Sequence, residues 1–227
     1  MGTYTFSGKK STVPSEQQDD DKPYDPTKLQ SVSDTSVPPE VDLALDYVPT
    51  RNSYARQSKG VSYVPELIVC HTTGSSFADA LQWYTNADSR YACHFLVGKD
   101  GRVVQLVDVG RAAWCQGTSV LDSASNYYGK STSALVRAKR TNANFYTVGI
   151  QFEGMSKDGG VLTDAQLHAG ARLVQHVRRE VYDHYHTVIP LDRRHVVAHS
   201  EVTPVAHPDC PGAKFPFAKL IELTKDL

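Results

Sequence analysis

The sequence predicts an α/β fold in which a mixed central β-sheet is flanked by helices. Short apolar runs typical of buried strands alternate with segments of helical periodicity along residues 41–227. One pair of these runs is joined by an Asp-Gly hairpin signal, which predicts an antiparallel pair of strands. One long segment opens with a capping box and keeps a single apolar stripe, as an amphipathic helix does. Because strands separated by helices pair in parallel, the sheet is expected to be mixed.

The first strand and helix of this fold are expected around residue 70. Leu67–His71 is a short apolar, β-branched run after Pro65, which is typical of a buried strand. Ser75 or Ser76 then offers an N-cap for a helix over residues 77–84. The side chains at the end of this strand are therefore the first along the chain that are expected to face a ligand-binding crevice.

A hairpin and a second long strand follow in the chain. The apolar runs 94–97 and 103–107 flank Lys99-Asp100-Gly101, and an Asp-Gly pair between apolar runs is a strong hairpin signal. Residues 147–153 form another apolar run, which Gly154 ends. We therefore expect three further strands between the first helix and the longest one.

The longest helix begins after Thr163. The Thr163 hydroxyl and the Gln166 side chain satisfy the first free backbone amides in a capping box. Apolar residues then recur every three or four positions and form one stripe: Leu167, Ala171, Val174, Val177 and Val181. A last strand is expected over His195–His199, and a C-terminal helix from Pro216 to about Asp226.

The first forty residues differ in composition from the rest of the chain. Residues 1–40 contain five prolines, three consecutive aspartates and few large aliphatic side chains. Such a segment cannot bury enough apolar area to offset the entropy lost on ordering. We therefore expect an extended or flexible N-terminal arm over residues 1–40 and one domain over residues 41–227.

Composition and charge exclude several classes of function. The 227 residues include 24 Lys and Arg against 25 Asp and Glu, a net charge of −1, which argues against a nucleic-acid partner. No apolar run approaches the roughly 20 residues of a membrane-spanning helix, so no membrane insertion is expected. The N-terminus lacks the apolar core of a secretory signal, which predicts synthesis in the cytoplasm without a signal peptide. Four cysteines are too few for a disulfide-built scaffold, and a monomer is compatible with the sequence.

Two predicted strands end in histidine, which indicates a metal site. His71 and His199 each close an apolar run, and strand ends face the crevice where α/β sheets collect ligands. Cys210, just before Pro211-Gly212, adds a thiolate. Two imidazoles and one thiolate leave zinc an open fourth position, the pattern of a catalytic site. The alternative is that the histidines are hydrogen-bonded structural residues and Cys210 a small buried apolar one.

Several motifs occur in the order seen in one enzyme family. They are His71-Thr72-Thr73, Cys93–Gly101, Ala113-Trp114, Gly149–Gly154, and His199–Val202 followed by Cys210–Gly212. Over roughly residues 50 to 223 the chain resembles the zinc-dependent N-acetylmuramoyl-L-alanine amidases. The branch is the one shared by phage lysozyme-type amidases, peptidoglycan-recycling amidases and animal peptidoglycan recognition proteins. The resemblance implies their single-domain fold, with a zinc-amidase catalytic domain over residues 41–227.

The resemblance implies that one zinc ion is bound by His71, His199 and the residue before Pro-Gly. Family members carry Cys or Asp at that position, and here Asp209 and Cys210 are adjacent. We favour Cys210, because it directly precedes Pro211 and thiolate is the stronger zinc ligand. Asp209 is the alternative ligand, or a residue that orients a ligand histidine.

The implied activity is hydrolysis of the amide between N-acetylmuramic acid and L-alanine in peptidoglycan, with zinc lowering the pKa of its bound water toward ~7. A lytic, endolysin-like enzyme that acts on the wall after release is the favoured setting, because a polar arm precedes the domain. The alternatives are a cytosolic enzyme that recycles muropeptides and a non-catalytic module that binds them. Substrate would thus be peptidoglycan or a muropeptide in each case.

The catalytic groups depart from those of the relatives. Recycling enzymes carry Glu where this chain has Gln151, and an amide cannot act as a base. Glu153 lies two residues on, and a strand would point it to the same face, so it is our candidate for the general base. His207 stands where many relatives have lysine, three residues before Cys210. It can donate to the oxyanion or relay a proton, or it is an exposed loop histidine.

Two further residues are candidates for substrate binding. His94 is expected to bind substrate or support the zinc site, with a structural role as the alternative. Trp114 is expected to form a wall that contacts sugar or peptide, with a buried position as the alternative. Cys70 and Cys93 each precede a strand histidine, point to the opposite face, and are expected to be core thiols.

Overall fold

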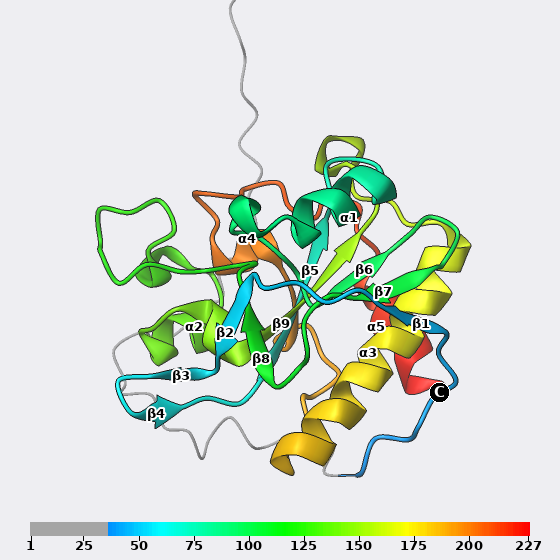
Figure 1. Ribbon diagram of the computed structural model, residues 1–227, viewed down its shortest axis with the longest axis horizontal. Coiled ribbons are helices and arrows are strands. Elements are labelled where there is room, and N and C mark those ends of the chain that lie inside the picture. The colour runs from blue at the N-terminus through cyan, green and yellow to red at the C-terminus, as the bar shows by residue number, and fades with distance from the viewer. Residues whose placement is uncertain (1–35) are drawn as a thin grey trace, which may run out of the picture. The chain divides into compact units, whose positions relative to one another are not determined.

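A six-stranded sheet forms the centre of the computed structural model, which describes residues 36–227 (Figure 1). The β6–β7 pair is antiparallel and every other neighbouring pair in this sheet is parallel. The predicted mixed sheet is therefore confirmed. The strands lie in the order β1 (Leu45–Tyr47), β7 (Val103–Gln105), β6 (Phe95–Val97), β9 (Thr147–Phe152), β5 (Leu67–Thr72) and β10 (Val196–Ala198).

The hairpin between β6 and β7 forms where the Asp-Gly pair predicts it. Gly101 has a φ of 86°, and its backbone N–H donates to the Gly98 carbonyl at 2.9 Å. A residue with a Cβ is strained at such a φ, so glycine allows this tight turn. A single tight turn therefore adds one antiparallel pair to a sheet whose other pairs are parallel.

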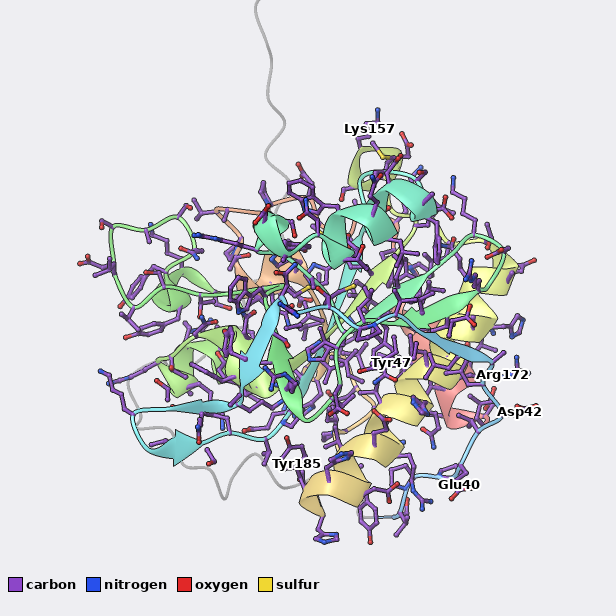
Figure 2. All side chains as sticks on the ribbon, viewed as in Figure 1. Glu40, Asp42, Tyr47, Lys157, Arg172 and Tyr185 are labelled. Carbon is purple, nitrogen blue, oxygen red and sulfur yellow. The ribbon has the colours of Figure 1, made fainter. Side chains whose placement is uncertain are left out.

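One face of the sheet is covered by the long helix α3 and by α5. Helix α3 (Asp164–Tyr185) has the predicted capping box between Thr163 and Gln166, and α5 (Phe217–Lys225) packs beside it. Arg172 projects from α3 away from the sheet (Figure 2), whereas the apolar stripe of this helix is buried apart from the half-buried Leu167. The main core fills this face with side chains of the strands and both helices, among them Ile68, Cys70, Ile150, Phe152, Val174 and Leu220.

The opposite face of the sheet carries shorter elements and two smaller cores. Helix α1 (Phe77–Thr85) packs over β6 and β7, and α2 (Ala134–Lys139) packs over β5 and β10. Since side chains alternate along a strand, the residues next to Cys70 on β5 and next to Ile150 on β9, among them His71 and Gln151, belong to this opposite face. The remaining elements are the paired strands β2 (Ser53–Ala55) and β8 (Arg111–Ala113), the pair β3 (Gln57–Ser58) and β4 (Val61–Ser62), helix α4 (His199–Val202), and the 3-10 helices η2 (Ala87–Ser89), η3 (Tyr128–Lys130), η4 (Ala143–Tyr146) and η5 (Ser156–Asp158).

Several expectations concern the ends of the chain and the thiols. The predicted arm over residues 1–40 and the signal-free N-terminus fall largely outside the described residues, so both stay predictions. Within residues 36–227, no helix is long and apolar enough to cross a membrane. All four cysteines are free, and Cys70 and Cys93 are fully buried in the cores, as predicted.

Candidate metal centre

His71 and His199 meet at the carboxyl ends of two neighbouring strands. His71 is the penultimate residue of β5, and His199 follows β10 directly as the first residue of α4. These strands are parallel, with Ala198 opposite Cys70, so the next residues lie side by side. The ring centroids are 4.3 Å apart, and both rings are almost completely buried. The sheet thus brings together two histidines that are 128 positions apart in the sequence.

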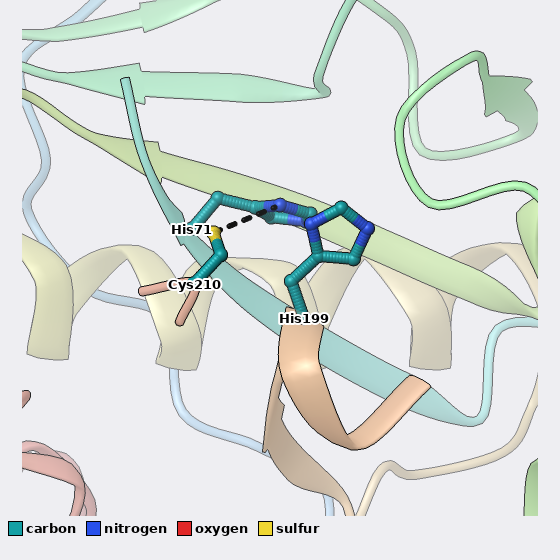
Figure 3. Close-up of side chains that lie close together, drawn as sticks. All are labelled: His71, His199 and Cys210. Carbon is teal, nitrogen blue, oxygen red and sulfur yellow. Dashed lines mark hydrogen bonds between the residues drawn. The ribbon is translucent and has the colours of Figure 1, made fainter. Parts of the chain in front are cut away.

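Cys210 reaches the same point from the loop after α4. Its carbonyl accepts a hydrogen bond from the Ser200 backbone N–H at 2.8 Å, which ties the loop to α4. Its Sγ lies 3.9 Å from His71 Nδ1 (Figure 3). A ligand atom from each of His71, His199 and Cys210 lies within 4.8 Å of the other two. Within residues 36–227, this is the one group of three or more metal-binding side chains.

Burial gives the two histidines, but not Cys210, the protonation state that binds a metal ion. Burial lowers the pKa of His71 to about 3, assisted by the nearby His207, while the adjacent Gln116 side chain opposes the change. Burial, His71 and His207 lower the pKa of His199 well below its usual value. Both imidazoles are therefore neutral at pH 7, the form that binds metal. Burial raises the pKa of the Cys210 thiol, so without a nearby cation the thiolate is disfavoured.

The geometry favours Cys210 over Asp209 as the third ligand. Asp209 is exposed and faces a separate surface depression. The loop is held by Thr72, whose hydroxyl donates to the Pro211 carbonyl at 3.2 Å. A Cβ at Gly160 would lie 2.1 Å from that same carbonyl oxygen, so the loop can approach only a glycine there. These contacts turn Cys210 inward toward His71.

A cavity of about 390 Å³ opens over the three side chains. One of its walls is α1, from which Trp83 and Tyr84 contribute their rings. Trp83 is 54% exposed, so its ring is available to a ligand. Tyr91 and Gln151 line the cavity as well, with the Gln151 Nε2 donating to the Tyr91 hydroxyl at 2.8 Å. The site therefore combines three metal-binding groups with an aromatic wall.

His207 also lines this cavity. Its ring stacks on His199 with centroids 4.1 Å apart and an interplanar angle of 23°. His207 is exposed, as its loop alternative expects, and its partial burial against His199 lowers its pKa, which favours the neutral imidazole at pH 7. The structure thus places His207 where a proton could be exchanged with a bound substrate, and its catalytic role remains a prediction.

Glu153 is not brought to the cavity. Its carboxylate accepts a hydrogen bond from the Lys99 backbone N–H at 2.9 Å, at the end of the β6–β7 hairpin. Strand β9 ends at Phe152, so the alternation that would align Glu153 with Gln151 no longer applies. Gln151 lines the cavity in its place, and its Oε1 is buried without a hydrogen-bond partner among the described residues.

His94 lies in the core and does not line the cavity. It is fully buried, and its Nδ1 accepts a hydrogen bond from the Gly149 backbone N–H at 3.0 Å. Its Nε2 lies 2.9 Å from the Arg111 carbonyl oxygen and 2.9 Å from Arg56 Nη2. Since Nδ1 is an acceptor, the proton of the neutral ring is on Nε2 and faces Arg111. These contacts fit the structural alternative for His94.

Trp114 also lies outside the residues that line the cavity. Its ring packs against Tyr54 with centroids 6.2 Å apart, and its indole N–H is buried without a partner in the described part of the chain. The tryptophan that lines the cavity is Trp83, which was not among the residues predicted from the sequence. A large aromatic residue on the exposed side of an amphipathic helix next to His71 was the available signal. Nothing in the sequence marks Tyr91, which reaches the cavity from a loop.

Comparisons with known proteins find a matching family model, a related sequence and similar structures. The family model described as N-acetylmuramoyl-L-alanine amidase matches residues 61–213. N-acetylmuramoyl-L-alanine amidase A of Achromobacter lyticus is 27% identical over 169 residues, which cover 69% of this chain and 81% of the relative. The crystal structure of a selenomethionine AmpD derivative has a TM-score of 0.52 at 21% identity and covers 79% of this chain and 93% of its own. AmiD from E. coli, solved with anhydro-N-acetylmuramic acid-L-Ala-D-γ-Glu-L-Lys, has a TM-score of 0.50 at 25% identity and covers 74% and 60%.

Proposed function

This chain belongs to the family of N-acetylmuramoyl-L-alanine amidases, and from that premise we propose that it is a zinc-dependent amidase of peptidoglycan. The bond cleaved is the amide between the lactyl group of N-acetylmuramic acid and L-alanine. The observation that carries this proposal is the convergence of His71, His199 and Cys210 on one cavity. A non-catalytic binding module has no need for three such donors around one point, so the enzyme is favoured.

The three donors fit zinc better than a harder cation. Two neutral imidazoles and a thiol that a cation would deprotonate are soft ligands, and three protein ligands leave a fourth position free. In this site His71 and His199 would bind through ring nitrogens and Cys210 through its sulfur. A bound zinc ion would supply Lewis acidity toward the scissile carbonyl and an activated water at neutral pH.

Proton transfer is assigned to His207. Its neutral ring lies in the cavity against His199 and can accept a proton from the attacking water. The resulting imidazolium can return that proton to the leaving amine of L-alanine. Glu153, our candidate from the sequence, has its carboxylate bound to the Lys99 backbone, which leaves this step to His207.

Substrate contact is assigned to the aromatic wall of the cavity. The exposed ring of Trp83 offers a flat apolar surface to a sugar or a stem peptide. Burial raises the pKa of Tyr91, so its hydroxyl stays protonated and can donate to a carbonyl oxygen. Trp83 and Tyr91 thus take the role that the sequence analysis gave to Trp114 and His94.

For the biological setting we propose lysis of the intact wall, with recycling of soluble muropeptides as the alternative. The support is the polar composition of residues 1–40, which precede the domain. The two settings differ in substrate: a lytic enzyme must cleave cross-linked peptidoglycan, whereas a recycling enzyme needs only soluble fragments. The relative rates on these two substrates discriminate between them.

The test combines metal analysis with product analysis on the purified full chain. We expect one zinc ion per chain by elemental analysis and the appearance of new L-alanine amino termini in purified cell walls. Soluble muropeptides tested in parallel report on the recycling alternative. A metal-free protein that binds muropeptides without releasing L-alanine termini would contradict the enzyme and support the binding module.

A further inference from the structure

The two ring nitrogens of His71 face different surroundings. Nδ1 faces Cys210 Sγ, 3.9 Å away, on the side of the metal-binding cluster. Nε2 is turned away from Cys210, toward the segment that follows β8, and lies 3.5 Å from Cys115 Sγ. A histidine that binds metal through one nitrogen usually donates its other N–H to an acceptor, which fixes the ring and its tautomer. The segment after β8 is therefore where the partner of Nε2 must be found.

Gln116 offers the strongest acceptor there. Its side chain is 1% exposed, and its Oε1 is buried with no well-formed hydrogen bond to any described residue. Its other end is anchored, because Gln116 Nε2 donates to the Thr147 hydroxyl, and that hydroxyl donates to the Ala143 carbonyl at 2.8 Å. The Gln116 backbone N–H also donates to Asn144 Oδ1 at 2.9 Å. With the amide nitrogen committed to Thr147, the acceptor oxygen is left for the His71 ring.

Gly149 makes this approach possible. It lies on β9, two residues before Gln151, and so belongs to the same face of the sheet as His71. A Cβ at this position would lie 2.8 Å from Cys115 Sγ and 3.0 Å from Gln116 Oε1. Any larger residue would push both groups away from the strand, so the absence of a side chain at Gly149 lets Cys115 and Gln116 lie close to β9, the strand that pairs with β5.

We propose that Gln116 is a positioning residue that holds His71 as the Nε2–H tautomer and keeps the Nδ1 lone pair free for the metal ion. Cys115 contributes a weaker, polarizable contact to the same nitrogen. The proposal deepens the proposed function and rests on it, because the tautomer matters only if His71 is a metal ligand. Gln116 itself touches neither metal nor substrate.

The test replaces Gln116 by methionine, which keeps the volume and removes the acceptor. The matched control is Gln175→Met on α3, on the opposite face of the sheet. Gln175 is likewise buried, at 2% exposed, and its side chain accepts a hydrogen bond from Arg178 Nη1 at 2.8 Å. We expect Gln116→Met to weaken zinc binding by about 10- to 100-fold in competition with a chelator. In the metal-free protein, nitrogen NMR should show the His71 tautomers becoming mixed. The control should change neither.

Two further variants, Gln116→Glu and Cys115→Ala, separate the role of the Gln116 oxygen from that of the Cys115 sulfur. Gln116→Glu retains an acceptor and should keep the Nε2–H tautomer, which also tests the idea if Gln116→Met does not fold. A larger loss of zinc affinity in Cys115→Ala than in Gln116→Met would assign the contact to sulfur and overturn the role of Gln116. So would an unchanged tautomer and affinity in Gln116→Met. If the wild-type chain binds no zinc, the proposed function fails, whereas the tautomer measurement still reports on Gln116 itself.

Discussion

His71 and His94 are two fully buried histidines whose surroundings give them different roles. Burial lowers the pKa of each to about 3, with His207 contributing at His71 and Arg56 at His94. At His94 both ring nitrogens have partners, the Gly149 N–H and the Arg111 carbonyl. At His71, Nδ1 lies 3.9 Å from Cys210 Sγ, beside a cavity that His199 also lines. A buried nitrogen left open toward other metal-binding groups therefore distinguishes the candidate metal site, whereas burial and pKa alone do not.

The largest expected effect comes from removing Cys210, the proposed metal ligand that faces His71. Cys210→Ala should abolish both zinc binding and amide hydrolysis, because two imidazoles alone hold zinc poorly. Elemental analysis and release of L-alanine termini measure the two losses. The matched control is Asp209→Ala, which alters the neighbouring exposed carboxylate and should leave one zinc ion per chain. Loss of zinc in Asp209→Ala with retention in Cys210→Ala would show that the third ligand is Asp209.

Replacing His94, by contrast, is expected to lower the free energy of unfolding and to leave metal binding unchanged. His94→Ala removes the partners of the Gly149 N–H and the Arg111 carbonyl inside the core. Leaving buried polar groups unpaired and opening a cavity costs about 2–4 kcal/mol, which urea denaturation measures as a lower free energy of unfolding. The folded fraction should still bind zinc. Loss of zinc from folded His94→Ala would mean that His94 supports the metal site.

The sequence predicted the sheet and brought forward the candidate metal ligands because both depend on local signals. Apolar runs give the strands, and His71 and His199 follow from the position of histidine at two strand ends. Glu153 was misplaced because strand alternation predicts a face only while the strand continues, and β9 ends one residue earlier. Trp83 was missed because the position of a helix over the sheet depends on tertiary packing. Sequence spacing does not contain that information.

A smaller effect is expected in the pH dependence of stability. The pKa of His94 is about 3 in the folded chain, below the ordinary value near 6.5, so its contribution to stability is complete above about pH 6.5 and is lost as the pH falls toward 3. At pH 5 this loss amounts to about 2 kcal/mol at most. In metal-free protein, the stability advantage of wild type over His94→Gln should therefore shrink between pH 7 and 5. Parallel urea denaturation of both proteins measures it, and a constant difference would contradict a buried neutral His94.

The smallest effect is expected at Glu153, which extends the comparison to a carboxylate. Like His94, Glu153 has its polar atoms engaged by the protein, here by the Lys99 backbone N–H. Glu153→Gln keeps an acceptor oxygen for that N–H, so the free energy of unfolding should fall by no more than about 1 kcal/mol. Turnover on cell walls should stay within about twofold of wild type, whereas His207→Ala should lower kcat by about 100-fold or more with zinc still bound. If turnover instead fell in Glu153→Gln and not in His207→Ala, proton transfer would belong to Glu153. The loop after β9 would then have to turn its carboxylate toward the cavity when substrate binds.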